Sequence, residues 1–125
     1  GHVTVGNHVI LAGMVAVHQF CSIGNHAFVA GGSLVRKDIP PYVKAAREPI
    51  SYVGINSVGL RRRGFDSKVI MQIQSIYRTL YQKKYNNTQA VSIMEAEMEA
   101  TKERDEIIQF IKNSQRGIMK GYFQN

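Results

Sequence analysis

The chain has 125 residues, of which 44% are hydrophobic, so it is long enough for one domain or two small ones. Its single cysteine excludes an internal disulfide, and no apolar run is long enough to cross a membrane. The formal net charge is +7, and most of the excess of Lys and Arg lies after residue 60, which favours acidic partners. We therefore expect a soluble, cytoplasmic protein with no transmembrane segment.

A six-residue period runs through the first part of the chain. An aliphatic side chain recurs at every sixth position, at Val5, Leu11, Val17, Ile23, Val29 and Val35. This period fits neither an α-helix, which repeats every 3.6 residues, nor an amphipathic strand, which repeats every 2. It predicts hexapeptide repeats of a parallel β-helix, in which three hexads make one triangular coil and residues eighteen apart stack.

A second repeat predicts where the corners of these coils fall. Gly6-Asn7-His8 lies one coil below Gly24-Asn25-His26, and we expect Gly and Asn to adopt the positive φ angles that tight corners need. Zinc needs three or four ligands, so we interpret the two stacked histidines as turn residues and predict no metal. Cys21 falls at an inward position and is expected to be a small buried apolar residue.

The period changes after residue 35. Pro40 and Pro41 cannot donate backbone hydrogen bonds, which predicts the end of regular strand pairing. Residues 44–60 are expected to be an irregular connection, because proline and glycine interrupt their apolar stretches. A helical period then predicts three helices, one from Asp66 to about Lys84, one capped by Thr88 and one over residues 103–113.

The expected fold class is therefore mixed β and α, with coils of a parallel β-helix followed by a small three-helix domain. We expect the β-helix over residues 1–43, the irregular connection over residues 44–60 and the helical domain over residues 61–125.

Six segments resemble a known family. They are GHV at 1–3, AVHQFC at 16–21, DIPPYV at 38–43, GIN at 54–56, GLRRRGF at 59–65 and SQRGI at 114–118. In this order they closely resemble the UDP-N-acetylglucosamine 3-O-acyltransferases, over essentially the whole chain. The hexads alone are weak evidence, because many acyltransferases have them. The resemblance implies that the β-helix is left-handed.

The resemblance also implies an activity and partners. Members of the family are homotrimers with active sites between neighbouring subunits. They transfer a 3-hydroxyacyl chain from acyl carrier protein to the 3-hydroxyl of UDP-N-acetylglucosamine, the first committed step of lipid A biosynthesis. A histidine is the general base, and no cofactor or metal is used. That histidine lies one coil before Gly1, so we expect this chain to be a C-terminal fragment that contains no catalytic residue and is inactive alone.

The same resemblance assigns binding residues. The matching substrate-binding positions are His2, His18, Gln19, Asn56, Arg62 and Arg63, of which the last three are nucleotide contacts. Guanidinium groups suit phosphate because they bind it bidentately and stay charged. Phe28 and Gly31 match positions of the acyl-chain groove, where glycine leaves the groove open. Val58 stands where some relatives carry Glu, which is a departure among the nucleotide contacts.

Two other functions fit parts of the pattern. The hexads also fit another hexapeptide acyltransferase of the same pathway, such as the N-acyltransferase that acts later, but the GLRRRGF segment favours the O-acyltransferase. The second alternative is a non-catalytic, trimerising β-helix module with a basic surface. Nucleic acid is not expected as a partner, because no recognised nucleic-acid-binding module accompanies the positive charge.

Overall fold

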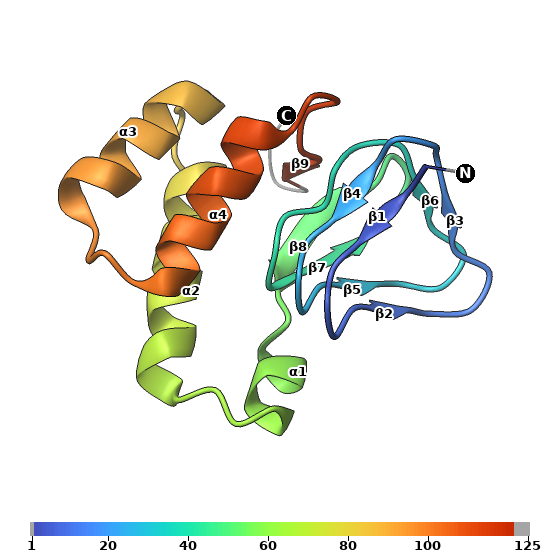
Figure 1. Cartoon of the computed structure of the whole chain (residues 1–125), viewed down its shortest axis with the longest axis horizontal. Helices are drawn as coiled ribbons and strands as arrows, with labels where there is room; N and C mark the ends of the chain where they lie inside the picture. Colours follow the sequence, from blue (N-terminus) through green and yellow to red (C-terminus); the bar gives the residue numbers. More distant parts are fainter. Residues whose placement is uncertain (1, 122–125) are drawn as a thin grey trace.

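The computed structural model describes residues 2–121 and places short β-helix coils beside a group of helices (Figure 1). Six short strands form the coils: β1 Thr4–Val5, β2 Ile10–Leu11, β3 Ala16–Val17, β4 Ser22–Ile23, β5 Phe28–Val29 and β6 Leu34–Val35. Each strand of the first coil pairs in parallel with a strand of the second, so that Thr4 opposes Ser22 and Ile10 opposes Phe28. The prediction of two stacked coils from the six-residue period is confirmed.

The aliphatic residues of the period form the interior of the coils. Ile23, Val29 and Val35 of the second coil are buried, and Cys21 is buried beside them as expected. Removal of such apolar side chains from water is the main contribution that stabilises a coil. Val5 in the first coil is 46% exposed, because no described strand pairs with β1 on the side away from β4.

The corners differ from the expectation in one respect, since histidine rather than glycine or asparagine has the positive φ angle. The φ angle is 58° at His8 and 61° at His26, whereas Gly24 is outside the left-handed region. Glycine is needed for another reason: a Cβ on Gly24 would lie 2.5 Å from the backbone nitrogen of Pro41 in the next coil. The missing side chain lets successive coils approach, and the left-handed position falls two residues later.

The expectation of an irregular connection over residues 44–60 is wrong. Two strands and a helix occupy this region: β7 Val43–Ala46, β8 Ser51–Ile55 and α1 Ser57–Arg62. β7 pairs in parallel with β5, with Lys44 opposite Phe28, and β8 pairs antiparallel with β7. Strand pairing continues beyond the prolines because Pro41 lies at a corner against Gly24, where the ladder requires no N–H donor.

The three predicted helices are present as α2 Ser67–Gln82, α3 Asn87–Glu97 and α4 Lys102–Asn113. Asp66 caps α2, whereas the cap of α3 is Asn86 rather than the expected Thr88. Asn86 and Gln89 form a reciprocal capping box, which satisfies two backbone N–H groups at the start of α3. The fourth helix, α1, is too short to show a full helical period in the sequence.

The helices are attached to the coils through α2 and through the last described segment. Tyr77 of α2 donates a hydrogen bond of 2.5 Å to the Pro41 carbonyl, and Tyr81 donates one of 2.8 Å to the Met119 carbonyl. β9, Lys120–Gly121, pairs in parallel with β8 at the edge of the five-stranded sheet (Figure 1). No helix in the described part of the chain combines the length and apolarity that a membrane crossing requires.

Candidate substrate-binding site

Three of the predicted substrate-binding residues lie at one corner of the coils. The ring of His2 stacks on that of Phe20, with centroids 5.3 Å apart and planes at 8°. His18 and Gln19 directly precede Phe20, between β3 and β4, and all of these side chains are exposed. The corner therefore presents His2, His18 and Gln19 on one accessible surface.

The ring of His18 makes a contact that favours one tautomer of the neutral imidazole. Its Nδ1 lies 3.2 Å from the carbonyl oxygen of Gln19, and a carbonyl oxygen can only accept, so in this contact the neutral ring carries its proton on Nδ1. Nε2 is then a hydrogen-bond acceptor. An exposed imidazole of this kind can accept from a sugar hydroxyl, while the amide of Gln19 can both donate and accept.

The predicted nucleotide contacts lie at a different corner, around His26. Arg63 follows α1 and places its Nη1 3.3 Å from Nδ1 of His26. Asn56 is 4% exposed; its amide nitrogen donates to the His26 carbonyl at 2.9 Å, and its amide oxygen accepts from the Gly59 N–H at 3.3 Å. Arg62 is exposed at the end of α1.

Asn56 has a structural role that the sequence did not reveal. It is the N-cap of α1 and at the same time connects the start of this helix to the corner that contains His26. Gly59 allows the arrangement, because a Cβ there would lie 2.5 Å from Nδ2 of Asn56. Asn56 therefore supports Arg62 and Arg63 by fixing the start of the helix that ends at Arg62, and its direct contact with a nucleotide stays a prediction.

A column of aromatic rings stands beside Arg63. His8, His26 and Tyr42 stack at centroid distances of 4.9 and 5.7 Å, and Phe65 packs edge-on against His26 at 5.0 Å. Burial lowers the pKa of His26, and the neighbouring Arg63 and His8 lower it further. His26 is therefore neutral near pH 7, and its Nδ1 can accept a hydrogen bond from the guanidinium group.

His8 and His26 were expected only as turn residues, and they do occupy turns. Their second role, as stacked rings next to Arg63, has one signal in the sequence, which is the recurrence of histidine at the eighteen-residue stacking distance. No group of three His, Cys, Asp or Glu side chains within residues 2–121 is arranged to hold a metal ion.

The two candidates for the acyl-chain groove follow His26 along the coil. Phe28 is a half-buried residue of β5, and Gly31 is exposed at the next corner. A Cβ on Gly31 would lie 3.2 Å from the Gly13 carbonyl oxygen in the coil below, so even a small side chain there requires a slight shift. Gly31 thus leaves open a surface that a longer side chain would occupy.

The described chain does not bring all of the predicted residues together. His18 and Gln19 lie at the corner between β3 and β4, whereas His26 and Arg63 lie at the corner between β4 and β5. In the triangular outline of the coils the face formed by β1 and β4 separates these two corners (Figure 1).

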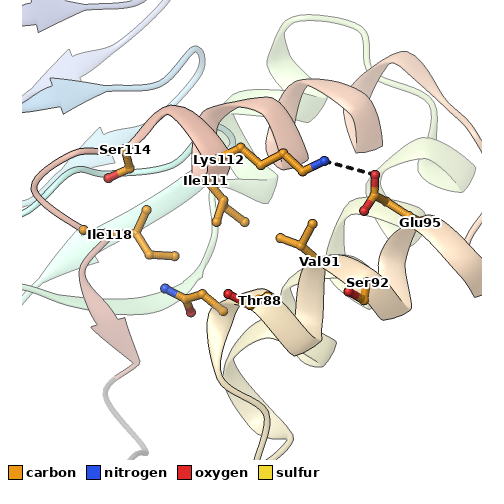
Figure 2. A pocket seen from close by; sticks show the side chains of 10 residues that line it. Thr88, Val91, Ser92, Glu95, Ile111, Lys112, Ser114 and Ile118 are labelled. Atoms are coloured by element: carbon orange, nitrogen blue, oxygen red, sulfur yellow. Dashed lines mark hydrogen bonds and ion pairs between the residues drawn. The ribbon is translucent and has the colours of Figure 1, made fainter.

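A separate pocket of about 340 Å³ lies between α3, α4 and the segment after α4. Hydroxyl and aliphatic side chains line it, among them Thr88, Ser92, Ser114, Val91, Ile111 and Ile118. Lys112 and Glu95 also line the pocket, and Figure 2 shows the ion pair that they form, with a length of 3.2 Å. None of the predicted binding residues lines this pocket, so it belongs to neither corner.

Comparison with known proteins shows the family. Residues 38–119 match the family described as UDP N-acetylglucosamine O-acyltransferase, domain 2. The acyl-(acyl-carrier-protein)–UDP-N-acetylglucosamine O-acyltransferase of Myxococcus xanthus is 42% identical over 118 residues, which cover 94% of this chain and 46% of that protein. The protein of the same name from Stenotrophomonas maltophilia strain K279a is 39% identical, and the match covers 96% of this chain and 46% of that protein.

Solved structures agree with these sequence matches. The UDP-N-acetylglucosamine acyltransferase of Bacteroides fragilis superposes with a TM-score of 0.92 at 44% identity, covering 94% of this chain and 46% of that one. These neighbours are left-handed β-helix proteins, which gives the hand of the coils. The chain spans a little less than half the length of the relatives that it matches. Because the family match covers more than half of its residues, the chain belongs to the UDP-N-acetylglucosamine O-acyltransferase family.

Proposed function

We propose that this chain is the C-terminal part of a cytoplasmic O-acyltransferase of lipid A biosynthesis. The complete enzyme transfers a 3-hydroxyacyl chain from acyl carrier protein to the 3-hydroxyl of UDP-N-acetylglucosamine. The names of the relatives at 42% and 39% identity contain both the acyl carrier protein and the nucleotide sugar. The structural observation that best supports the proposal is the adjacent pair Arg62 and Arg63, of which Arg63 contacts a neutral imidazole.

This pair of arginines suits a nucleoside diphosphate. The ion pairs of the described residues join Arg104 to Asp105 and Lys112 to Glu95, and neither involves Arg62 or Arg63. The two guanidinium groups therefore keep their positive charge uncompensated. Phosphate oxygens accept charge-assisted hydrogen bonds from such groups, which contribute about 1.5–3 kcal/mol each.

The corner with His2, His18 and Gln19 suits the sugar, because its exposed groups are uncharged donors and acceptors when the histidines are neutral. In the reaction the sugar hydroxyl oxygen attacks the thioester carbonyl carbon, the C–S bond breaks, and the departing thiolate takes the proton that a general base removed. We assign that base to the family histidine one coil before Gly1. The thioester is already activated, so the proposal requires no cofactor.

A homotrimer accounts for the separation of the two corners. In this proposal the corner of His18 from one subunit faces the corner of Arg63 from the next, and the sugar and the diphosphate are bound between them. Phe20, which is 57% exposed, is a large apolar residue at the corner of His18, and a subunit contact of this kind removes it from water.

The first experiment measures UDP binding by calorimetry in the complete acyltransferase. Arg63→Ala is expected to weaken binding by about 10- to 100-fold, because one charge-assisted phosphate contact is lost. Arg61→Ala is the matched control, since we assign Arg61 to the solvated surface. Unchanged affinity in Arg63→Ala would contradict the nucleotide site.

A second experiment tests the assignment of the base. The 125-residue chain alone is expected to form no acylated nucleotide sugar from acyl carrier protein thioester, as followed by mass spectrometry. Turnover by the chain alone would show that one of its own residues is the base. Light scattering of the complete enzyme should give the mass of three chains.

A further inference from the structure

We infer that His26 is a positioning residue, which holds the guanidinium group of Arg63 in the orientation that binds a phosphate of the nucleotide. The inference rests on the proposed function for the class of ligand. The contact joins Nη1 of Arg63 to Nδ1 of His26 at 3.3 Å, across 37 positions of the sequence. An arginine side chain loses rotamer entropy when it binds a ligand, and a contact that orders it beforehand reduces this loss.

His26 is itself fixed from several sides. Its ring lies between those of His8 and Tyr42, with planes at 15° and 13°, and the edge-on contact with Phe65 closes a third side. Its carbonyl accepts the hydrogen bond from Asn56, so the backbone of this corner is also tied to α1. A ring constrained in this way presents Nδ1 in one direction.

The contact needs a neutral ring, because a guanidinium group can only donate and Nδ1 must accept. The side chains that face the ring are His8, Tyr42, Phe65 and Arg63. Tyr42 is uncharged at neutral pH, since burial and its hydrogen bond to Glu106 raise its pKa. The lowered pKa of His26 is consistent with the neutral state.

A neutral partner explains why histidine is suitable at this position. A carboxylate would orient Arg63 equally well but would neutralise its charge and compete with phosphate. An imidazole occupies one N–H of the guanidinium group and leaves its net charge for an anion. The contact with His26 therefore orients the guanidinium group of Arg63 without neutralising its charge.

Two substitutions distinguish the contribution of the hydrogen-bond acceptor of His26 from that of its aromatic ring. His26→Phe keeps an aromatic ring at a corner of positive φ, as Phe20 does at 68°, and removes the acceptor. His26→Asn keeps an acceptor near the position of Nδ1 in a residue that tolerates positive φ, and removes the ring. In the complete acyltransferase we expect His26→Phe to raise the Kd of UDP and the KM of UDP-N-acetylglucosamine about tenfold, with kcat little changed. His26→Asn should recover most of this loss.

A double-mutant cycle with Arg63→Ala completes the test. Because His26 acts through Arg63, we expect His26→Phe to weaken UDP binding no further in the Arg63→Ala background. Additive losses of UDP affinity in the double mutant would overturn the inference. Wild-type UDP affinity in His26→Phe would overturn it too, and so would equally weak UDP binding by His26→Phe and His26→Asn. Unfolding temperatures identify a variant that does not fold, in which case His26→Leu replaces His26→Phe. If Arg63→Ala itself leaves UDP binding unchanged, the proposed nucleotide site fails rather than the role of His26 alone.

Discussion

The carboxylate of Asp38 accepts a hydrogen bond of 2.5 Å from the hydroxyl of Ser114, although 76 positions separate the two residues. Its other oxygen accepts from the backbone N–H of Ser22 at 2.8 Å, and Asp38 is only 3% exposed. The main chain of Asp38 also pairs with Gly117 and Met119. One buried residue therefore connects the second coil, the corner after β6 and the segment after α4.

We expect Asp38→Ala to lower the free energy of unfolding by on the order of 3 kcal/mol, because two donors lose their acceptor and each unsatisfied donor costs about 1–3 kcal/mol. Asp38→Asn should lose less, since its amide oxygen can still accept from Ser22 and its nitrogen can donate to Ser114. Urea unfolding followed by circular dichroism measures both variants. Wild-type stability in Asp38→Ala would show that these contacts contribute nothing to the fold.

The close approach of stacked coils at Gly24 gives a second prediction. In Gly24→Ala the new methyl group would overlap backbone atoms of Pro41, which cannot move without a shift of the coil, so we expect a loss of about 1–3 kcal/mol. Gly13→Ala is the matched control, because its Cβ meets nothing within 4 Å. Thermal unfolding of the two variants should differ clearly. Equal unfolding temperatures would mean that the coils tolerate the added methyl group.

Three stacked tyrosines make the free energy of unfolding decrease at alkaline pH. Tyr52 lies 5.6 Å from Tyr77 and 4.4 Å from Tyr81 between ring centroids. Burial raises the pKa of Tyr52 from 10.0 to about 12 and raises the pKa values of Tyr77 and Tyr81 above 10.0 as well. An unfolded tyrosine ionises near pH 10 while these folded tyrosines stay neutral. The stabilisation is therefore fully present below pH 10 and is lost as the pH rises through the folded pKa values.

We expect the free energy of unfolding at pH 11 to be lower than at pH 9 by on the order of 1 kcal/mol for each of these tyrosines. Urea denaturation at the two pH values measures the difference. Tyr52→Phe should reduce it, whereas Tyr85→Phe, at a side chain that is 40% exposed, is the control and should leave it unchanged. A difference that Tyr52→Phe does not alter would mean that other groups cause the alkaline loss.

The open surface at Gly31 gives a prediction about the acyl donor, which depends on the proposed function. Gly31→Met would place a long side chain beside the Gly13 carbonyl, and a close-packed wall yields little to it. Each buried methylene contributes about 0.8 kcal/mol, so lost room for two of them should shift donor preference toward shorter chains by about tenfold or more. Competition between donors of different length measures this, with Gly31→Ala as the graded control. An unchanged preference in Gly31→Met would place the length limit elsewhere.

The sequence by itself determined the six strands of the coils and the helices α2, α3 and α4, but not β7, β8 and α1. An aliphatic residue at every sixth position indicates the stacked triangular coil, in which residues of this period such as Val29 and Val35 are buried. The change to a helical period likewise determined α2, with Ile73 and Leu80 buried as the period requires. The corner of His2, His18 and Gln19 was also predictable, because its members lie within one coil of each other.

Only the tertiary structure decided how the coils and the helices meet. Arg63 was predicted to bind phosphate from its charge and its motif, but its contact with His26 comes from another element 37 positions earlier. Glu106 of α4 accepts from the hydroxyl of Tyr42, 64 positions away, and from Asn25, 81 positions away. No local period encodes such contacts, because they form only after apolar packing has brought the helices against the coils, and the side chains that then become neighbours share no repeat.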